Sequence, residues 1–321
     1  MATVAELGEF ALIDRWRTRI GSAPENEVWS GDDAAVIASP GDRLVLTTDV
    51  LVEGIDFDLR YAEGPDIGWK AMASNLSDVA AMGGRPRRAV ATLTLRPDTS
   101  VGLVDGILEG MLELSGRWDV GLVGGDVSGS PTLSLGVTVV GVAEIPLLRS
   151  GARIGDVLCV TGELGGAAGG LLALKDGRLD MSGLIERQLR PAPRVAEGVA
   201  LAQAGASAMI DVSDGLAADL DHLVSPSGVG CEVDIESIPV DPALAGVADL
   251  IWPMEAALTG GEDFELLVAL PEERVGDATE ALTDLGTVLT RIGRVTQGAA
   301  RIGSNSISEW RDKGWEHLRR P

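Results

Sequence analysis

The sequence predicts an α/β protein, or one built of α+β layers, and divides it into two domains. Strand-like and helix-like segments follow one another in mixed order, which is not the pattern of a helical bundle. The 321 residues exceed the roughly 100–200 residues of one typical domain. A hydrophobic content of 45% allows a packed core. A boundary near Ile145 and Pro146 gives the expected domains 1–145 and 146–321.

In the first half, β-rich segments alternate with segments whose apolar residues recur at helical spacing. Trp69, Met72 and Leu76 follow that spacing, and Gly83-Gly84 is a helix stop signal. The expected strands are 44–48, 89–95, 119–123 and 133–142, and the expected helices are 67–82 and 101–114.

The second half continues the alternation after the expected boundary. Arg190-Pro191-Ala192-Pro193 is a loop that leads to one of its helices, and Ser213-Asp214-Gly215 separates a strand from a helix that runs through Leu223. The expected strands are 156–161, 208–212 and 264–269, and the expected helices are 165–173, 195–204, the segment up to 223 and part of 247–258.

The charge balance excludes two classes of partner. The chain has 26 Lys+Arg against 49 Asp+Glu, a net charge of −23. Nucleic-acid binders hold phosphates with clustered basic residues, and anionic membranes attract basic surfaces. We therefore expect neither a nucleic acid nor a membrane as partner.

Location follows from the N-terminus and the cysteines. The first residues carry acids and no long apolar run, so no signal peptide is expected. Apolar stretches such as 133–143 are too short and too glycine-broken to span a bilayer. Cys159 and Cys231 cannot make a disulfide framework, and we interpret them as small buried residues of a reduced compartment. The expected location is the cytoplasm.

Aspartate and glycine occur together in six short clusters, most of them where a strand or helix is expected to end. Such ends are where α/β folds place their chemistry. Any single cluster is also explained by a turn, and Ser213-Asp214 by a helix cap. The clusters are Gly31-Asp32-Asp33, Thr47-Thr48-Asp49, Asn75-Leu76-Ser77-Asp78, Gly124-Gly125-Asp126, Asp211-Val212-Ser213-Asp214-Gly215 and Gly260-Gly261-Glu262-Asp263.

Asp78 is the acid that a turn explains least well. It falls near the end of the expected helix 67–82, where the helix dipole disfavours a carboxylate. Apolar residues surround it in the sequence. An acid in that position needs a nearby cation, which either an arginine or a metal ion would supply.

Together the clusters indicate hard divalent cations. Mg²⁺ takes carboxylate oxygens, waters and substrate phosphates, and several ions would relieve the repulsion among converging acids. A zinc site of the usual kind is not expected, because the chain has two histidines and its cysteines lack metal-ligand spacing. So acidic a chain binds a nucleoside triphosphate through such ions or through a basic patch, for which Arg149 and Arg153 are candidates. Gly124 and Gly125 would let the backbone approach a phosphate.

In this order and spacing the clusters resemble the thiamine-monophosphate kinase family of the aminoimidazole-ribonucleotide-synthetase-like superfamily. The resemblance covers nearly the whole chain, and the combination is more specific than any one motif. The matching segments are Gly8-Glu9-Phe10, GDDAAV (31–36), TTDVLVEG (47–54), NLSDVAAMG (75–83), GGD (124–126), RSGARIGD (149–156), IDVSDGL (210–216) and GGEDFEL (260–266).

The resemblance implies an enzyme that transfers the γ-phosphoryl group of ATP to thiamine monophosphate. It implies a two-domain fold whose N-terminal domain pairs sheets in a homodimer, with ATP at that domain's edge. The implied Mg²⁺ ligands are Asp32, Thr47, Thr48, Asp49, Asp78, Asp126, Asp211 and Asp214. The implied ATP contacts are Gly125, Asp126, Arg149 and Ser213, and the implied thiamine contacts are Glu262 and Trp315.

Position 56 departs from the family pattern, which usually has a histidine where this chain reads Ile55-Asp56-Phe57. We keep Asp56 as a candidate substrate contact with two alternatives. Its carboxylate would repel the substrate phosphate unless a metal ion or an arginine intervened, or it would instead face the cationic ring or an amino group. Trp315 has the alternative of being a surface-packed aromatic residue. Two other functions remain open: another ATP-dependent synthase of the superfamily, and a non-enzymatic nucleotide-binding protein.

Overall fold

The computed structural model describes residues 25–28, 32–39 and 42–314. In this part of the chain, the first sheet has five strands in the order β1-β2-β5-β3-β4. All neighbours are antiparallel except β3 and β4, which are parallel. The strands are β1 (Ala35–Ser39), β2 (Asp42–Val52), β3 (Arg85–Leu95), β4 (Gly121–Gly129) and β5 (Ser134–Ala143).

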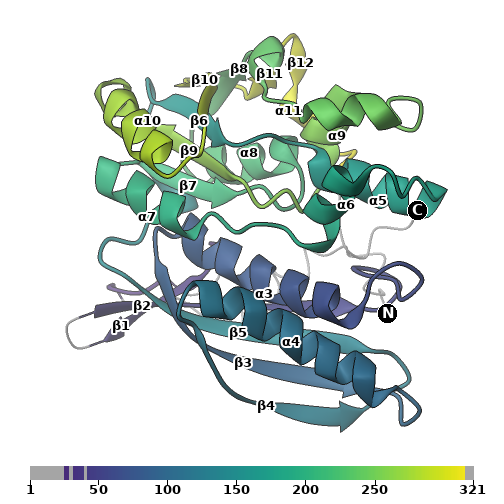
Figure 1. The fold of residues 1–321 in the computed structure, drawn as a ribbon. Coiled ribbons are helices and arrows are strands. Elements are labelled where there is room, and N and C mark those ends of the chain that lie inside the picture. The colour runs from purple at the N-terminus through teal and green to yellow at the C-terminus, as the bar shows by residue number, and fades with distance from the viewer. Residues whose placement is uncertain (1–24, 29–31, 40–41, 315–321) are drawn as a thin grey trace, which may run out of the picture.

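Two helices, α3 (Gly64–Ala81) and α4 (Val101–Arg117), cover one face of this sheet (Figure 1). The helices pack backbone against backbone. A Cβ added to Gly68 would lie 1.9 Å from the carbonyl oxygen of Ile107, so only glycine permits this approach. On the opposite face of the sheet, Val50 and Val90 are 57% and 42% exposed.

The second sheet has seven strands in the order β12-β11-β8-β10-β6-β9-β7 within the described residues. Its strands are β6 (Val157–Thr161), β7 (Ala208–Asp211), β8 (Gly230–Val233), β9 (Leu266–Leu270), β10 (Leu289–Thr296), β11 (Arg301–Ile302) and β12 (Asn305–Ser306). The helices packed around it are α5 (Gly166–Asp176), α6 (Ser182–Leu189), α7 (Val195–Ala204), α8 (Leu216–Val224), α9 (Pro253–Thr259), α10 (Val275–Asp284) and α11 (Ile307–Arg311).

Helix α3 lies between the two sheets and joins their cores (Figure 1). One apolar cluster runs from Val137 on β5 through Leu76 on α3 to Val268 on β9. Polar contacts reinforce the junction: the Trp69 indole N–H donates to the carbonyl oxygen of Pro191 at 2.8 Å. A carboxylate or hydroxyl on α3 therefore has a defined position relative to both sheets.

Most expected elements are confirmed, and the largest errors in their bounds concern β2, β3 and β4; β3 begins at Arg85, four residues before its expected start. The helix expected at 195–204 is α7, and the one expected at 67–82 is α3. Strand β2 does not end at Asp49 but continues to Val52, because Val50, Leu51 and Val52 still pair with β5. Strand β4 does not stop before the glycines but runs through Gly125, where a Cβ would lie 2.0 Å from the carbonyl oxygen of Ala91. The sequence pattern did not predict β1, β8, β10, β11, β12, α6, α10 or α11.

Both cysteines are free and buried, as expected. Burial raises the pKa of each thiol to about 12. Among the described residues, no helix combines the length and apolar character needed to cross a bilayer.

Candidate active site

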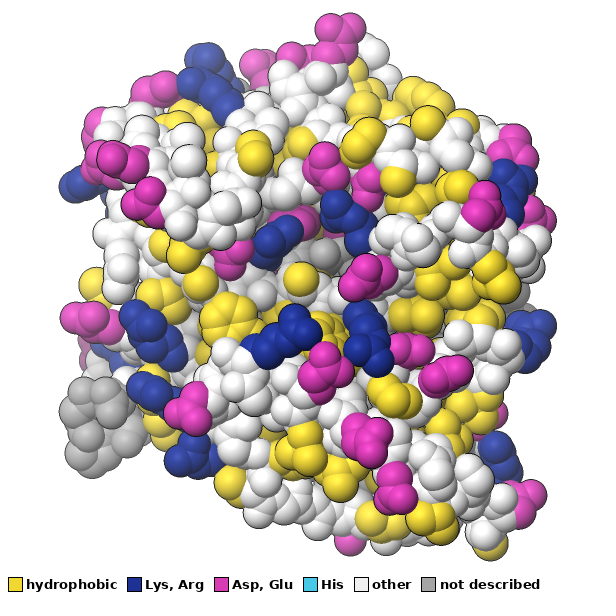
Figure 2. Space-filling view, viewed as in Figure 1, with side chains coloured by type: hydrophobic (Ala, Val, Ile, Leu, Met, Phe, Trp, Pro, Cys, Tyr) yellow, Lys and Arg dark blue, Asp and Glu magenta, His cyan; other side chains and the backbone are white. Residues whose placement is uncertain are grey.

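A cavity of about 700 Å³ collects half of the predicted site residues. It is lined by β2, α3, the segment after β7 and the segment before β9. Charged side chains of both signs gather across the middle of one face of the molecule, between its upper and lower halves (Figure 2). The predicted site residues that line the cavity are Asp49, Asp56, Asp78, Asp211, Ser213, Asp214 and Glu262.

Five carboxylates form what we call the acidic centre: Asp32, Asp33, Asp49, Asp78 and Asp211. Different elements supply them. Strand β2 turns Asp49 toward α3, the last turn of α3 carries Asp78, and β7 ends at Asp211. Carboxylate oxygens of Asp33, Asp78 and Asp211 lie within 4.8 Å of one another. The convergence brings together acids that are far apart in the sequence.

Hydrogen bonds fix the orientation of these carboxylates. The Thr47 hydroxyl donates to Asp78, and the Ser77 hydroxyl donates to Asp211 at 2.5 Å. Burial raises the pKa of Asp49, and the neighbouring Ser74 and Asp78 side chains oppose that rise. Neighbouring hydroxyl groups therefore hold the Asp78 and Asp211 carboxylates in place.

The pKa values of the acidic centre show how costly its charge is. Burial, and then the charge of Asp33, raises the pKa of Asp211 to about 8. Burial and the neighbouring Asp33 raise the pKa of Asp32 to about 7. Burial, with Asp49 and Asp211 close by, holds the pKa of Asp78 well above its usual range. Acids in these positions favour a bound cation over a bare negative charge.

Arg149 is the cation that forms ion pairs with the acidic centre in the described part of the chain. Its guanidinium pairs with Asp33, and its main-chain N–H donates to Asp32 at 3.1 Å. Burial alone would lower the pKa of Arg149, but the carboxylates of Asp33 and Asp32 outweigh burial and raise it. One arginine leaves most of the five carboxylates without a paired positive charge.

Asp33 is the member of the centre that the sequence analysis missed. Its Oδ2 atom is buried and has no hydrogen-bond partner. An unpartnered buried carboxylate oxygen beside two further acids is what a divalent cation would satisfy, so the residues present fit Mg²⁺. The doubled aspartate in the 31–36 segment was the available signal, but a sequence alone does not say which of two adjacent side chains faces the cavity.

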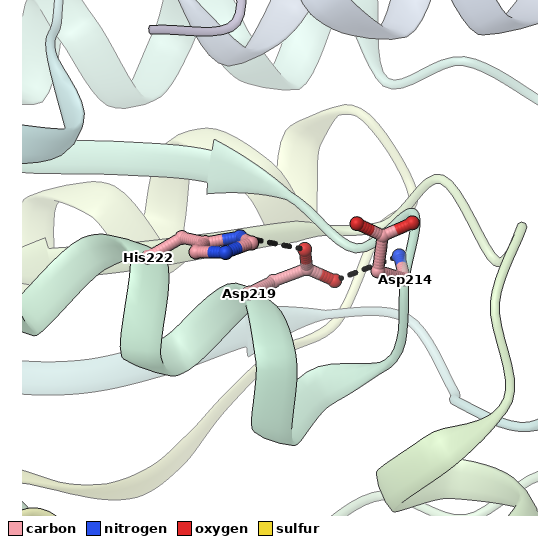
Figure 3. A group of neighbouring side chains, drawn as sticks. All are labelled: Asp214, Asp219 and His222. Atoms are coloured by element: carbon pink, nitrogen blue, oxygen red, sulfur yellow. Dashed lines mark hydrogen bonds and ion pairs between the residues drawn. The ribbon is translucent and has the colours of Figure 1, made fainter. Parts of the chain in front are cut away.

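The loop after β7 has its own support (Figure 3). Asp219 on α8 accepts from the main-chain N–H groups of Ser213 and Asp214, at 3.0 and 3.1 Å. His222 Nδ1 lies 4.0 Å from Asp219, on the other side of that carboxylate. Asp214, Asp219 and His222 are close enough to share a metal ion, but Asp219 already holds the loop that presents Asp214. The geometry gives Asp219 a structural role.

Glu262 lies at the other end of the cavity, in a segment held by its neighbours. Its φ of +69° places it in the left-handed region, which shows that the surrounding structure constrains it. Glu262 accepts from Lys70 at 2.7 Å and from Gln188 at 2.8 Å. The next residue, Asp263, accepts from Gly165 N–H at 2.6 Å and thereby anchors the segment to the start of α5.

Asp56 is turned back toward its own backbone. Its carboxylate accepts from the Val52 N–H at 2.7 Å and closes the turn that follows β2. The turn lines the cavity, so a substrate would meet this segment. The carboxylate that replaces the family's usual histidine therefore shapes the turn as well as lining the cavity.

Two predicted metal ligands, Thr48 and Asp126, lie on the face of the first sheet opposite to α3. Thr48 is exposed and hydrogen-bonds to Thr138 at 2.8 Å, whereas Thr47 and Asp49 face α3. Gly125 and Asp126 lie in the exposed edge strand β4. The described chain does not bring these residues to the acidic centre. Trp315 lies outside the described residues.

Comparisons with known proteins agree with this architecture. The family models "AIR synthase related protein, N-terminal domain" and "AIR synthase related protein, C-terminal domain" match residues 31–143 and 153–303. Thiamine-monophosphate kinase of Rhodopirellula baltica is 39% identical over 89% of this chain and 88% of its own. The Salmonella typhimurium enzyme of that name is 38% identical over 98% and 99%. The solved structure "AaThiL complexed with AMPPCP and TMP" has a TM-score of 0.88, 35% identity and 99% coverage of both chains. The chain therefore belongs to the thiamine-monophosphate kinase family of AIR synthase-related proteins.

Proposed function

We propose that this protein phosphorylates thiamine monophosphate with ATP. The observation that carries the proposal is the single cavity that joins the acidic centre to Glu262. A relative solved with an ATP analogue and TMP, matching both chains over 99% of their length, supports both substrates. The other synthases of the superfamily and a non-enzymatic role are not favoured, because the curated relatives are kinases at 34–39% identity.

The acidic centre would hold the nucleotide end of the reaction. Asp33, Asp49, Asp78 and Asp211 fit as Mg²⁺ ligands, with Asp32 beside them. When bound, Mg²⁺ would be held by these side chains and would neutralise part of the phosphate charge. Arg149 and Ser213 would contact ATP, and Asp214, presented by the loop that Asp219 holds, would join the cation ligands.

The reaction needs no general base from this chain. The acceptor is a phosphate monoester, whose second pKa is about 6, so it is mostly dianionic near neutral pH. One of its oxygens attacks the γ-phosphorus, the bond from that phosphorus to the β–γ bridging oxygen breaks, and ADP leaves with the bond electrons. The protein's task is to hold two polyanions in line and to neutralise the charge between them. Carboxylates around cations suit that task.

A direct assay tests the proposed function. ADP release with MgATP and thiamine monophosphate should exceed release without an acceptor, and thiamine diphosphate should form in equal amount. Unphosphorylated thiamine serves as a matched control, because it keeps both rings but lacks the attacking phosphate. Equal ADP release with and without thiamine monophosphate would contradict the proposal.

The face of the first sheet that is exposed among the described residues supports a homodimer. Strand register places Val50, Gly136, Thr92 and Asp126 in one row across β2, β5, β3 and β4. Three strand spacings of about 4.8 Å place Asp126 roughly 14 Å from Val50 across that row. A second copy of this sheet would cover the exposed valines and bring its Asp126 and Gly125 to the first copy. We propose that these two residues, with Thr48, complete the nucleotide site across the dimer.

Stability of the metal-free protein should fall as the pH rises from about 5 to about 9. Asp211 has a pKa of about 8 in the folded protein and Asp32 of about 7, both above the ordinary value of 3.8. Between those limits the folded state binds more protons than the unfolded state, so raising the pH removes stability. Thermal melts at pH 5, 7 and 9 in EDTA should show the decline, and Mg²⁺ should flatten it.

Asp211→Asn provides the control, because Asp211 has the higher pKa of these two carboxyls. The melting temperature of this variant in EDTA should depend less on pH than that of the wild type. A wild-type melting temperature that stays level or rises with pH in EDTA would contradict the assignment.

A further inference from the structure

Lysine is rare in this chain, and all three lysines lie at one cavity. The 26 basic residues comprise 23 arginines and three lysines, Lys70, Lys175 and Lys313. Lys175 and Lys313 line the cavity described above, and Lys70 binds two residues that line it. Surface ion pairs elsewhere in the described chain use arginine, as in Arg178–Asp249 and Arg291–Glu272.

Lys70 is the buried member of the three, with 3% of its surface exposed. Its ammonium group lies 2.6 and 2.7 Å from the two carboxylate oxygens of Glu262. It also donates to the main-chain carbonyl oxygen of Asp56 at 3.0 Å. An ammonium has three N–H donors, and these contacts supply three acceptor atoms. The site suits lysine, because the five-donor fork of an arginine would leave donors without partners.

The contacts of Lys70 join the two segments that are candidates for acceptor binding. Asp56 belongs to the turn after β2, and Glu262 precedes β9, 206 residues further along the chain. Gln188 on α6 supplies a second, neutral donor to Glu262 at 2.8 Å. Without Lys70 the Glu262 carboxylate would keep that amide but lose its buried counter-charge.

Helix α3 also sets the distance from this group to the acidic centre. Lys70, Ser74 and Asp78 are four residues apart, so they lie along one side of the helix. A rise of 1.5 Å per residue places Lys70 about 12 Å from Asp78 along the axis. One rigid element therefore carries a cation ligand at one end and the Glu262 anchor at the other.

We infer that Lys70 is a positioning residue for the acceptor: it holds Glu262 and the turn at Asp56 in place for the cationic, organic end of thiamine monophosphate. The role rests on the proposed function. Glu262 compensates the charge of Lys70, so Lys70 affects the acceptor only through the Glu262 carboxylate. Its loss should therefore weaken acceptor binding and leave nucleotide binding, which depends on the far end of α3, nearly unchanged.

A double-mutant cycle tests the inference. Lys70→Met should raise the KM for thiamine monophosphate about tenfold or more, while the KM for MgATP stays within about twofold. Glu262→Gln should raise the acceptor KM similarly. The double variant Lys70→Met/Glu262→Gln should be no worse than Glu262→Gln alone, because Lys70 has nothing left to position.

Thermal melts separate positioning from a purely structural role. Lys70→Met should lower the melting temperature, because it leaves a carboxylate without its counter-charge, and adding Glu262→Gln should recover much of that loss. A double variant that regains stability but keeps a high KM for thiamine monophosphate supports the positioning role. Two results would overturn that role: Lys70→Met raises the KM for thiamine monophosphate and the KM for MgATP equally, or the rises in acceptor KM caused by the two single substitutions multiply in the double variant. If Lys70→Met does not fold, Lys70→Gln carries the same test.

Lys175→Met is the matched control, because Lys175 lines the cavity on α5 and forms no ion pair among the described residues. It should change the acceptor KM less than Lys70→Met does, and an equal change would show that general positive charge, not position, matters. Absence of acceptor-dependent ADP release from the wild type would refute the proposed function itself. An active wild type with an unaltered Lys70→Met variant would refute the role of Lys70 alone.

Discussion

Replacing Asp49 by asparagine should lower turnover by at least about 10³-fold while making the metal-free protein more stable. The side chain keeps its shape but loses a charge that a cation would use. Burial is the main cause of the raised pKa of Asp49, and Asp56 and Asp33 add repulsion. Removing the charge therefore removes a buried, repelled carboxylate and stabilises the folded metal-free protein. The same change takes one proposed cation ligand from the nucleotide site.

Steady-state kinetics at saturating MgATP and thermal melts in EDTA check the two halves of this expectation. Each kcal/mol of relieved destabilisation should raise the melting temperature by about 1–2 °C, because an unfolding entropy of about 2.1 cal/mol/K per residue acts over 321 residues. Mg²⁺ should stabilise the wild type more than the variant. Asp98→Asn, which changes an aspartate whose side chain is 86% exposed, should alter neither property. Near-normal turnover of Asp49→Asn would remove Asp49 from the proposed ligands.

A mixture of two inactive variants should recover activity if Asp126 serves the partner's site. Asp126→Ala and Asp78→Asn should each abolish turnover alone. In a mixed dimer, the subunit that carries Asp126→Ala keeps its own Asp78 and receives Asp126 from its partner. One of the two sites is then complete, so purified mixed dimers should show about half of the wild-type activity. The prediction follows from the exposed face on which Asp126 lies, away from the acidic centre.

The control combines two substitutions that both affect ligands of the acidic centre, one in each subunit. Mixed dimers of Asp78→Asn and Asp49→Asn should stay inactive if every centre uses both acids of its own subunit together with the partner's Asp126. One subunit then lacks Asp78 and the other lacks Asp49, so neither site is complete. Inactive mixed dimers of Asp126→Ala and Asp78→Asn would show that Asp126 acts within its own subunit. A monomer in solution would refute the dimer.

Local pattern predicted most of the elements but not all of their ends. The apolar spacing of Trp69, Met72 and Leu76 indicates α3 because those residues face a core that a helix must bury. The ends of β2 and β4 were wrong because aspartate and glycine also occur inside strands when a neighbouring strand or ligand needs them there. The presence of aspartate or glycine alone therefore does not indicate where the hydrogen bonding between two strands ends.

The sequence likewise indicated some residues of the candidate site and gave no sign of others. Asp78 could be singled out because an acid near a helix C-terminus among apolar residues needs compensation, and the structure places it among Asp33, Asp49 and Asp211. Lys70 left no such signal, since a lysine in an amphipathic helix is ordinarily a solvated residue. Its importance arises from Glu262, which is 192 residues away in the sequence.

The chain by itself determined the kinds of residue available: acids and glycines in six clusters, two histidines and three lysines, which favours cations and phosphates over zinc or nucleophilic catalysis. Only the tertiary structure decided which acids face one another, which of Asp32 and Asp33 is left with an unpartnered oxygen, and that Asp126 lies on the far side of its sheet. The physical reason is that strand and helix periods set the face of a side chain locally, whereas packing between distant elements decides what stands opposite that face.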